Sequence, residues 1–170
     1  MLMLVKKAIN GDSEAFLELI DIHQDTMLRI AHGYFTQNAD IADAMQDTIL
    51  DAYEHLSELR EPQYFKTWLI RILINNCNHI YRSNKKYISL ETMPEINQKT
   101  SLDPDTPLNK FHELLECVSE ENRLCFQLYY GEELTTREIS DILHIKESTI
   151  RSRMHRERIK LKDKLQDTAI

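Results

Sequence analysis

The sequence predicts an all-α protein made of two small helical domains. Glycine and proline are scarce, with three and four copies in 170 residues, whereas leucine and isoleucine are abundant. Both features favour helices over turn-rich β structure. Apolar residues also recur every three or four positions over most of the chain, which is the helical period.

The helical pattern is interrupted once, and the interruption divides the chain. Three of the four prolines, Pro94, Pro104 and Pro107, fall in this stretch, which has few large apolar residues. Such a composition is typical of a linker. We therefore expect one domain over residues 1–85, a flexible linker over 86–107 and a second domain over 108–170.

The composition excludes several classes of protein. Charged residues make up 29% and apolar residues 42%, a balance typical of soluble proteins. No apolar run is long enough for a membrane span, so we expect no membrane insertion. Lys6 and Lys7 follow the first apolar residues, which is the wrong order for a secretory signal. Three cysteines without a C-x-x-C pair argue against disulfides and zinc, and favour the cytoplasm.

The net charge of −7 conceals two basic islands. Residues 60–86 hold six Lys or Arg against one acid, and residues 144–170 hold eight against four. The islands carry +5 and +4, which leaves −16 on the rest of the chain. Two separated basic patches predict two contacts with a polyanion. The acidic remainder either keeps the protein soluble or binds something other than nucleic acid.

The second domain contains a predicted helix-turn-helix. Thr135 and Glu138 have the spacing of a capping box at the start of a helix. A break at residues 144–146 precedes a second helix from about Glu147. Two short helices joined by such a turn form the DNA-binding motif.

The second helix of this motif has distinct faces. Its predicted core face holds Ile150, Met154, Leu161 and Leu165. The opposite arc carries Ser152, His155, Arg156 and Ile159, flanked by Arg151, Arg153, Lys160 and Lys162. Polar side chains between cations suit a major groove, where they can contact bases and phosphates. An ordinary basic surface helix is the simpler alternative.

The basic island of the first domain also lies on a predicted helix. Its core face should hold Phe65, Leu69, Ile72, Leu73 and Ile80. The opposite arc carries Thr67, Arg71, Asn75, Asn78 and Arg82, with Trp68 and His79 at its edge. Amide, aromatic and cationic groups together suit single-stranded DNA, and the preceding loop, 59–64, could receive an extruded base. Phe65 and Trp68 could equally be core residues, and the pattern does not explain Asn76.

Residues 40–59 predict an acidic amphipathic helix. Its core face holds Ile41, Met45, Thr48, Ala52, Leu56 and Leu59. The other face holds Asp40, Asp43, Asp47, Asp51, Glu54 and Glu58, bordered by Gln46 and the outward Leu50. Carboxylates around an exposed leucine suit docking on a basic partner helix. A solvated face is the simpler alternative, and a metal site is less favoured.

Residues 40–48, residues 65–72 with Asn75, and residues 149–158, in this order, resemble three segments of the extracytoplasmic-function group of bacterial sigma-70 factors. The resemblance covers nearly the whole chain. It implies sigma region 2 in the first domain and sigma region 4 in the second. It also implies a subunit that binds core RNA polymerase and directs promoter-specific transcription initiation, for a stress response, under the control of an anti-sigma factor.

The resemblance implies three sets of site residues. The two largest polymerase subunits should be the partners of region 4 and of the docking helix, with contacts at Asp43, Gln46, Asp47, Leu50 and Asp51. The melted single strand of the −10 element should meet Arg60, Tyr64, Lys66, Trp68, Arg71, Asn75, Asn78, His79 and Arg82. The duplex −35 element should meet Arg151, Ser152, Arg153, His155, Arg156 and Lys160.

The chain departs from the family pattern at several positions. His144 stands where the helix-turn-helix turn usually has glycine, Ile41 and Ala42 replace a pair that often includes an acid, and Asn76 and His79 differ from common choices. A stand-alone helix-turn-helix regulator with an N-terminal sensor domain is the main alternative. We expect no enzyme, because no nucleophile–base motif, phosphate loop or metal-ligand spacing appears. No cofactor and no catalytic residue are therefore assigned.

Overall fold

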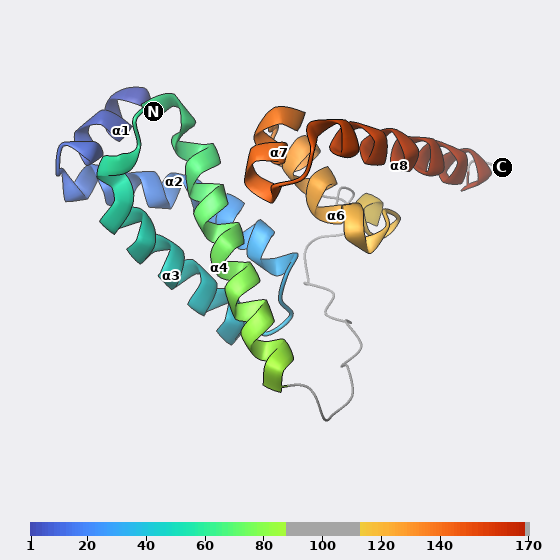
Figure 1. Cartoon of the computed structure of the whole chain (residues 1–170), viewed down its shortest axis with the longest axis horizontal. Helices are drawn as coiled ribbons and strands as arrows, with labels where there is room; N and C mark the ends of the chain where they lie inside the picture. Colours follow the sequence, from blue (N-terminus) through green and yellow to red (C-terminus); the bar gives the residue numbers. More distant parts are fainter. Residues whose placement is uncertain (88–112, 169–170) are drawn as a thin grey trace. The chain divides into compact units, whose positions relative to one another are not determined.

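The computed structural model describes residues 1–87 and 113–168 (Figure 1). All regular elements in these residues are helices, as predicted. The chain divides into two compact units, with the border between residues 96 and 97. The expected linker at 86–107 lies outside the described residues, except that its first two residues continue a helix.

The described residues of unit 1 form four α-helices and two short 3-10 turns. The α-helices are α1 (Leu2–Ile9), α2 (Ser13–His32), α3 (Asn38–His55) and α4 (Phe65–Tyr87), and the turns are η1 (Leu56–Glu58) and η2 (Pro62–Tyr64). Gly11 joins α1 to α2 with a φ of 96°, which suits a residue without Cβ. The Asp12 side chain then caps α2 by accepting a hydrogen bond from the Ala15 amide at 3.0 Å.

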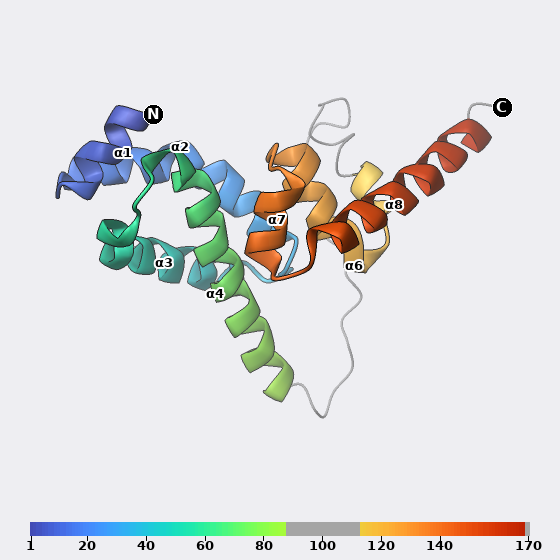
Figure 2. The ribbon, with the colours of Figure 1, turned by 45° about the horizontal axis from the view of Figure 1, so that its top comes forward.

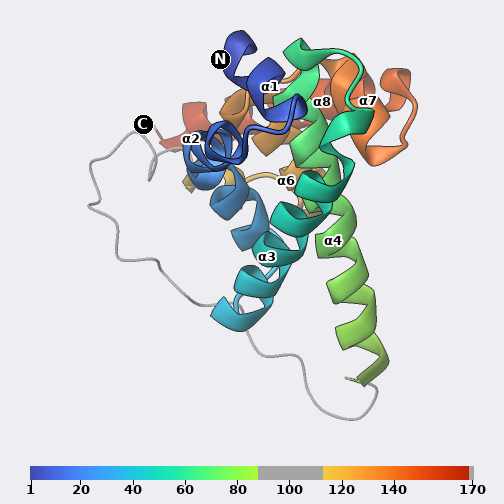
Figure 3. The same cartoon turned by 90° about the vertical axis from the view of Figure 1, so that its left-hand side faces the viewer.

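Helix α4 packs against both α2 and α3 (Figure 3). Its buried side chains are Phe65, Thr67, Leu69, Ile70, Leu73, Ile74 and Cys77. This arc is wider than the predicted core face, and Ile72 and Ile80 are only half-buried. The predicted face was too narrow because a helix that contacts two neighbours buries two adjoining stripes. Thr67, which we expected on the polar face, therefore lies in the core.

Helix α3 buries nearly the predicted face. Its buried residues are Ile41, Ala44, Thr48 and Ala52, and Leu56 and Leu59 follow in the next turns. Met45 is only half-buried. The Thr48 hydroxyl donates to the Ala44 carbonyl at 2.6 Å, so this polar residue is satisfied within the core.

Unit 2 contains the predicted helix-turn-helix. Residues 113–116 are helical, followed by α6 (Glu120–Phe126), the single π-helical turn η3 (Gln127–Gly131), α7 (Thr136–Leu143) and α8 (Glu147–Thr168). Figure 2 shows α7 and α8 joined by their short turn. The capping box is confirmed: the Glu138 amide donates to Thr135 Oγ1 at 3.2 Å, and the Thr135 amide donates to Glu138 Oε2 at 2.9 Å.

The turn between α7 and α8 is left-handed at its first residue. His144 has φ 55° and ψ 36°, the conformation that glycine adopts most easily. Ser140 stabilises the turn from inside α7, since its hydroxyl donates to the Ile145 carbonyl at 2.6 Å. Histidine thus replaces glycine in the turn without changing the conformation that the motif requires.

The core of unit 2 is built on α7, α8 and the segment before them. Leu128, Ile139, Ile142, Ile150 and Met154 are all buried. Leu161 is half-buried, and the side chain of Leu165 lies outside the described residues. Glu157, which we did not expect in the core, is only 2% exposed. Among the described residues, no helix is both long and apolar enough to cross a membrane.

Candidate functional site

The outer face of α3 combines carboxylates with one large apolar side chain. Asp43, Gln46 and Asp47 are exposed, and Leu50 is 61% exposed. They recur at intervals of three or four residues, so they share one side of the helix. Because the opposite side of α3 is buried in unit 1, these four side chains point to solvent. They are called the docking face below. Its exposed leucine surrounded by acids can bind a surface that is both apolar and basic.

Asp51 is placed differently from the other expected docking residues. It is half-buried, and its Oδ2 accepts a hydrogen bond from Asn76 Nδ2 at 2.8 Å. The same amide lies 3.3 Å from Thr48 Oγ1. Asn76, for which the sequence pattern offered no explanation, therefore joins α4 to α3. A second bond between these helices runs from Asn84 Nδ2 to Asp40 Oδ1 at 3.1 Å.

Helix α4 presents a polar and cationic face away from its neighbours. Asn75, His79 and Arg82 are exposed on it. Trp68, Arg71 and Asn78 are half-buried, as is Lys66 at the start of the helix. Before α4, Arg60 is exposed and the Tyr64 ring is 51% exposed. The face therefore offers amides, an indole edge and cations within one helix, and a second aromatic ring lies beside it.

The Trp68 ring is shared between the core and the surface. Its centroid lies 5.9 Å from that of Phe65, which is 2% exposed. Phe65 in turn lies 5.6 Å from the His23 ring of α2. The two alternatives for these aromatics are thus divided: Phe65 is a core residue, whereas Trp68 packs on it and keeps part of its surface available to a ligand.

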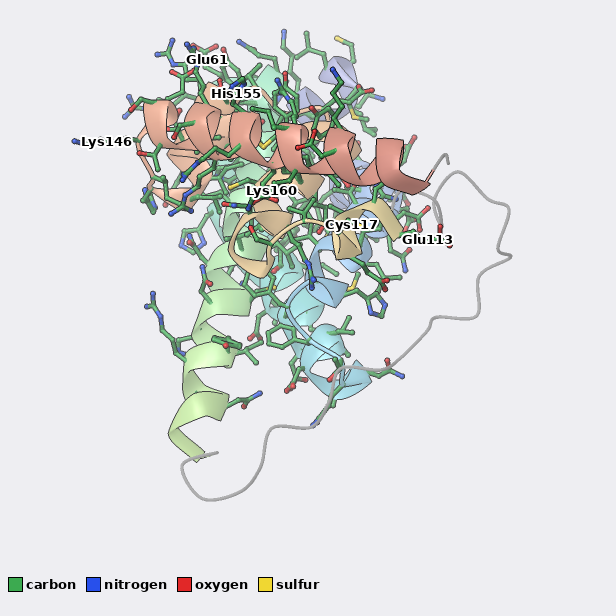
Figure 4. All side chains as sticks on the ribbon, turned by 90° about the vertical axis from the view of Figure 1, so that its right-hand side faces the viewer. Glu61, Glu113, Cys117, Lys146, His155 and Lys160 are labelled. Carbon is green, nitrogen blue, oxygen red and sulfur yellow. The ribbon has the colours of Figure 1, made fainter. Side chains whose placement is uncertain are left out.

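Helix α8 presents the second polar face. Arg151, Ser152, His155, Arg156 and Lys160 are exposed, and Arg153 is half-buried. In Figure 4, Lys146 extends from the start of α8, while His155 and Lys160 lie on opposite edges of the helix. Ile159 is 50% exposed between the polar residues. Ser152, His155, Arg156 and Ile159, which the sequence placed opposite the core face, are thus all exposed.

Several cations of α8 are held by other protein groups. Arg151 Nη2 lies 2.7 Å from Glu147 Oε1, and Lys160 Nζ lies 3.0 Å from Glu157 Oε1. Arg158 Nε donates to the Tyr130 hydroxyl at 2.6 Å, and its guanidinium lies over the rings of Tyr129 and Tyr130. These bonds fix the positions of the positive charges before any ligand binds.

Arg156 has a different environment. Its Nε makes only a long hydrogen bond, 3.4 Å, to the Ser152 carbonyl on the same helix. The side chain is exposed, and it forms no ion pair with any side chain that the structure describes. Its guanidinium can therefore turn its donor edge to an acceptor outside the protein.

The Glu147 carboxylate joins the starts of α7 and α8. Its Oε1 accepts hydrogen bonds from Thr136 Oγ1 and Arg151 Nη2, both at 2.7 Å. These bonds from Thr136 and Arg151 lower the pKa of the Glu147 carboxyl, so it stays ionised. The two helices of the motif are thereby held together where they approach each other.

Glu157 fixes the middle of α8 to the start of α6. It accepts hydrogen bonds from the Ser119 hydroxyl at 2.8 Å, the Asn122 amide at 3.0 Å and the Ser119 backbone amide at 3.3 Å. Burial opposes its charged form and raises the pKa, but the bonds from Ser119, Lys160 and Asn122 outweigh burial and lower the pKa to about 2. The buried charge is therefore fully partnered, as its position requires.

The sequence pattern did not predict these positioning contacts. Glu157 lies seven residues after Ile150 and three after Met154, so its spacing already placed it on the core face. The pairing of Asn76 with Asp51, and of Arg158 with Tyr130, had no such signal. Within residues 1–87 and 113–168, no group of three or more His, Cys, Asp and Glu side chains is arranged to hold a metal ion.

Two family models match the chain. "Sigma-70 region 2" matches residues 19–87 and "Sigma-70, region 4" matches residues 108–161. The first match covers α3, α4 and most of α2, and the second ends within α8. The two matches therefore contain the docking face of α3 and both polar faces.

Relatives and solved structures of the same kind match over nearly the full chain. SigW, an extracytoplasmic-function RNA polymerase sigma factor of Bacillus subtilis, is 27% identical over 98% of this chain and 100% of its own length. A sigma-E factor of Haemophilus influenzae is 27% identical over 96% and 94%. Among structures, RpoE from Bartonella quintana, solved with the anti-sigma factor NepR, matches with a TM-score of 0.68 at 19% identity, over 89% of this chain and 96% of that one. CnrH, solved with the cytosolic domain of CnrY, matches with a TM-score of 0.66 at 21% identity, over 98% and 97%.

Proposed function

Because the chain belongs to the extracytoplasmic-function group of the sigma-70 family of RNA polymerase sigma factors, we propose that it docks on core polymerase through α3 and reads promoters with α4 and α8. In this function it selects promoters and leaves the chemistry of transcription to the polymerase. The observation that carries the proposal is the separation of one acidic, leucine-bearing face on α3 from two cationic, polar faces on α4 and α8.

The docking face consists of Asp43, Gln46, Asp47 and Leu50. A clamp helix of the largest polymerase subunit that is basic and apolar would match it in charge and in shape. Leu50 becomes a buried anchor when the chain docks on the polymerase, and the acids around it select the partner and its orientation. Region 4 makes a second polymerase contact, with the flap of the other large subunit.

The −10 element is read by α4 and the loop before it. Opening a duplex costs a few kcal/mol per flipped base, and contacts to the single strand must offset this cost. Trp68 and Tyr64 offer aromatic surfaces for stacking, and Asn75 and Asn78 offer amide groups to base edges. The phosphates of the strand are held by the cations of this region: Arg60, Lys66, Arg71 and Arg82, with His79 beside them.

The −35 element is read by α8 in the major groove. Ser152, His155 and Arg156 lie on its outer arc and reach the base edges, with Arg156 as the residue that can pair with guanine. Arg151, Arg153 and Lys160 lie to either side and hold the phosphates. The helix-turn-helix places α8, and the Glu147 and Glu157 contacts set its rotation.

Docking makes the two weak readers effective. The charge of −16 outside the basic islands disfavours DNA binding by the free protein. When both units are fixed on the polymerase, the second DNA contact becomes intramolecular, with a high effective concentration. The acidic part of the chain therefore has a function in polymerase binding rather than in DNA binding.

The activity requires a means of control, and we propose an anti-sigma factor that covers the docking and reading faces. The sigma factor RpoE, which has a similar fold, was solved with the anti-sigma factor NepR, and CnrH was solved with the cytosolic domain of CnrY. A stress response is the corresponding physiological setting, and the cytoplasm is the compartment in which the protein would bind polymerase. The anti-sigma partner is expected to compete with core polymerase for the face that contains Leu50.

Run-off transcription tests the proposal. Purified chain and core polymerase are incubated with a pool of genomic fragments, and the transcript starts are mapped. We expect a short set of starts that share −35 and −10 sequences and vanish without the chain. A gel shift without polymerase distinguishes the stand-alone regulator, which would bind duplex operators tightly by itself. Tight binding without polymerase, together with no new transcripts, would contradict the proposed function.

A further inference from the structure

Asp51 and Asn76 join the docking helix to the −10 helix. Asn76 Nδ2 on α4 donates to Asp51 Oδ2 on α3 at 2.8 Å and lies 3.3 Å from Thr48 Oγ1. Thr48 is fully buried, and its own hydroxyl donates to the Ala44 carbonyl. The amide of Asn76 therefore meets a side-chain arrangement that is already fixed on α3.

Each member of this pair immediately follows a residue of a proposed contact surface. Asp51 follows Leu50, which is 61% exposed on the docking face. Asn76 follows Asn75, which is exposed on the −10 face. Neighbouring residues of a helix point about 100° apart. The outward residues can thus bind their partners while the inward residues bond to each other.

The outer half of α4 depends on polar contacts for its position. Among the side chains of α4 that the structure describes, which end at Asn84, the last buried one is Cys77. This half carries Asn78, His79 and Arg82, three of the proposed −10 contacts. The bonds from Asn76 to Asp51 and from Asn84 to Asp40 lie at its two ends.

Resting on the proposed function, we propose that Asp51 and Asn76 are positioning residues that set the −10 face of α4 relative to the docked α3. Asp51 acts inward on α4 rather than outward on the polymerase. The proposal changes the role that the sequence pattern suggested for Asp51, since the acidic stripe treats Asp47 and Asp51 alike. It makes the orientation of the melting helix a direct consequence of how α3 is held.

The two roles of Asp51 differ in what an asparagine can replace. The Asn76 amide needs an oxygen acceptor, which the Asp51→Asn side chain still provides. A polymerase contact that depends on charge needs the carboxylate itself. Asp51→Asn should therefore preserve positioning and abolish an ionic contact, whereas Asp51→Ala removes both.

The experiment uses the full chain assembled with core polymerase on a promoter mapped as above. The affinity for core is measured by fluorescence anisotropy, and strand opening by a fluorescent base in the −10 element. We expect Asn76→Ala and Asp51→Ala to keep core affinity within about twofold and to slow opening about tenfold. The double variant should open the promoter no more slowly than either single variant does. The Asp51→Asn variant should open it at close to the rate of the unaltered protein.

Two matched variants control for general effects. Asn38→Ala removes an exposed amide at the start of α3, and Asp21→Ala removes an exposed charge on α2, outside the acidic stripe. Both should leave the rate of opening unchanged. Thermal unfolding is recorded for each variant, and opening is measured well below the lowest midpoint, so that a loss of folded protein is not read as a loss of positioning.

The outcomes separate this inference from the proposed function. Failure of the unaltered chain to bind core polymerase would overturn the proposed function. If the unaltered chain binds and opens promoters, normal opening by Asn76→Ala would overturn the positioning role alone. A loss of core affinity in Asp51→Asn equal to that in Asp51→Ala would also overturn it, because the charge would then be the contact.

Discussion

The Glu157 carboxylate accepts a hydrogen bond from the Ser119 hydroxyl at 2.8 Å, which ties α8, the proposed reading helix, to the N-cap residue of α6. Glu157 is the residue after Arg156, so the side chain that anchors α8 and the side chain proposed to read a base are adjacent. The anchor carries a negative charge in the core of unit 2. Its contribution to stability therefore depends on pH, and its loss should alter DNA reading as well as folding.

Unit 2 should lose stability in acid through Glu157. The pKa of this group is about 2 in the folded protein, against 4.5 for an ordinary glutamate. Because folding lowers the pKa, the stabilisation is complete above pH 5, declines as pH falls below 4.5 and is lost near pH 2. Glu157→Gln should lower the free energy of unfolding by about 2 kcal/mol at pH 7 and much less at pH 2. Urea unfolding at both pH values measures the difference.

The control for this prediction is Glu116→Gln, which changes an exposed glutamate of the same unit. It should shift the unfolding free energy by less than about 0.5 kcal/mol at either pH. If Glu157→Gln destabilised the protein equally at pH 7 and pH 2, the charge of Glu157 would not be the source of its effect.

Arg156 and Arg158 should differ in their effects on DNA, although they are two residues apart. Arg156 bonds only weakly to its own helix, whereas Arg158 is held by the Tyr130 hydroxyl and by two aromatic rings. In the holoenzyme, Arg156→Ala should weaken binding to the correct −35 element by about 1–3 kcal/mol. Arg158→Ala should weaken it less and should lower the melting temperature more, because it breaks a contact inside unit 2.

Competition between matched and altered −35 sequences measures this difference. Loss of affinity for the correct sequence alone identifies a base contact by Arg156. An equal loss on all sequences would instead make Arg156 a phosphate anchor, and a larger loss for Arg158→Ala would reverse the assignment of the two residues.

The sequence predicted surfaces well and pairings poorly. The helical period alone placed Asp47 and Leu50 on the outside of α3 and Ile150 and Met154 on the inside of α8, because these positions depend on one helix. Asp51 has the same spacing and charge as its neighbours on the stripe. It turns inward because Asn76 of α4, 25 residues later in the chain, places a hydrogen-bond donor beside it. Such a partner becomes visible only when two helices are packed.

The width of a buried face is also a property of packing. Thr67 is polar and lies on the arc of α4 that the helical period assigned to DNA. It is nevertheless buried, because α4 contacts α2 as well as α3. Glu157 shows the reverse case: its spacing placed it inside, but a carboxylate is normally excluded from a core. Its partners Ser119 and Asn122 lie more than 30 residues earlier in the chain. The family resemblance supplied order and function, and the structure supplies these pairings.

His144→Gly should stabilise unit 2. The residue adopts φ 55°, where a side chain costs about 1 kcal/mol relative to glycine. The greater freedom of glycine in the unfolded chain offsets part of this gain. We therefore expect a net rise of about 0.5 kcal/mol in the free energy of unfolding, measured with urea at pH 7. Asp141→Gly, on the exposed side of α7, is the control and should lower it by a similar or larger amount. Destabilisation by His144→Gly would show that the histidine side chain has a compensating contact.

Asp47→Lys should abolish binding to core polymerase without unfolding the protein. Asp47 is exposed on the docking face, one turn from Asp43 and beside the outward Leu50, so a lysine there changes the local charge by two units and opposes a basic partner. The helical circular dichroism should stay intact, because the Asp47 side chain is exposed. Co-purification with core measures binding, and Glu18→Lys, an equal charge reversal at an exposed position of α2, should leave it unchanged. If Asp47→Lys still bound core polymerase, the contact would lie on another face, because a charge reversal at the centre of the docking face would disrupt binding there.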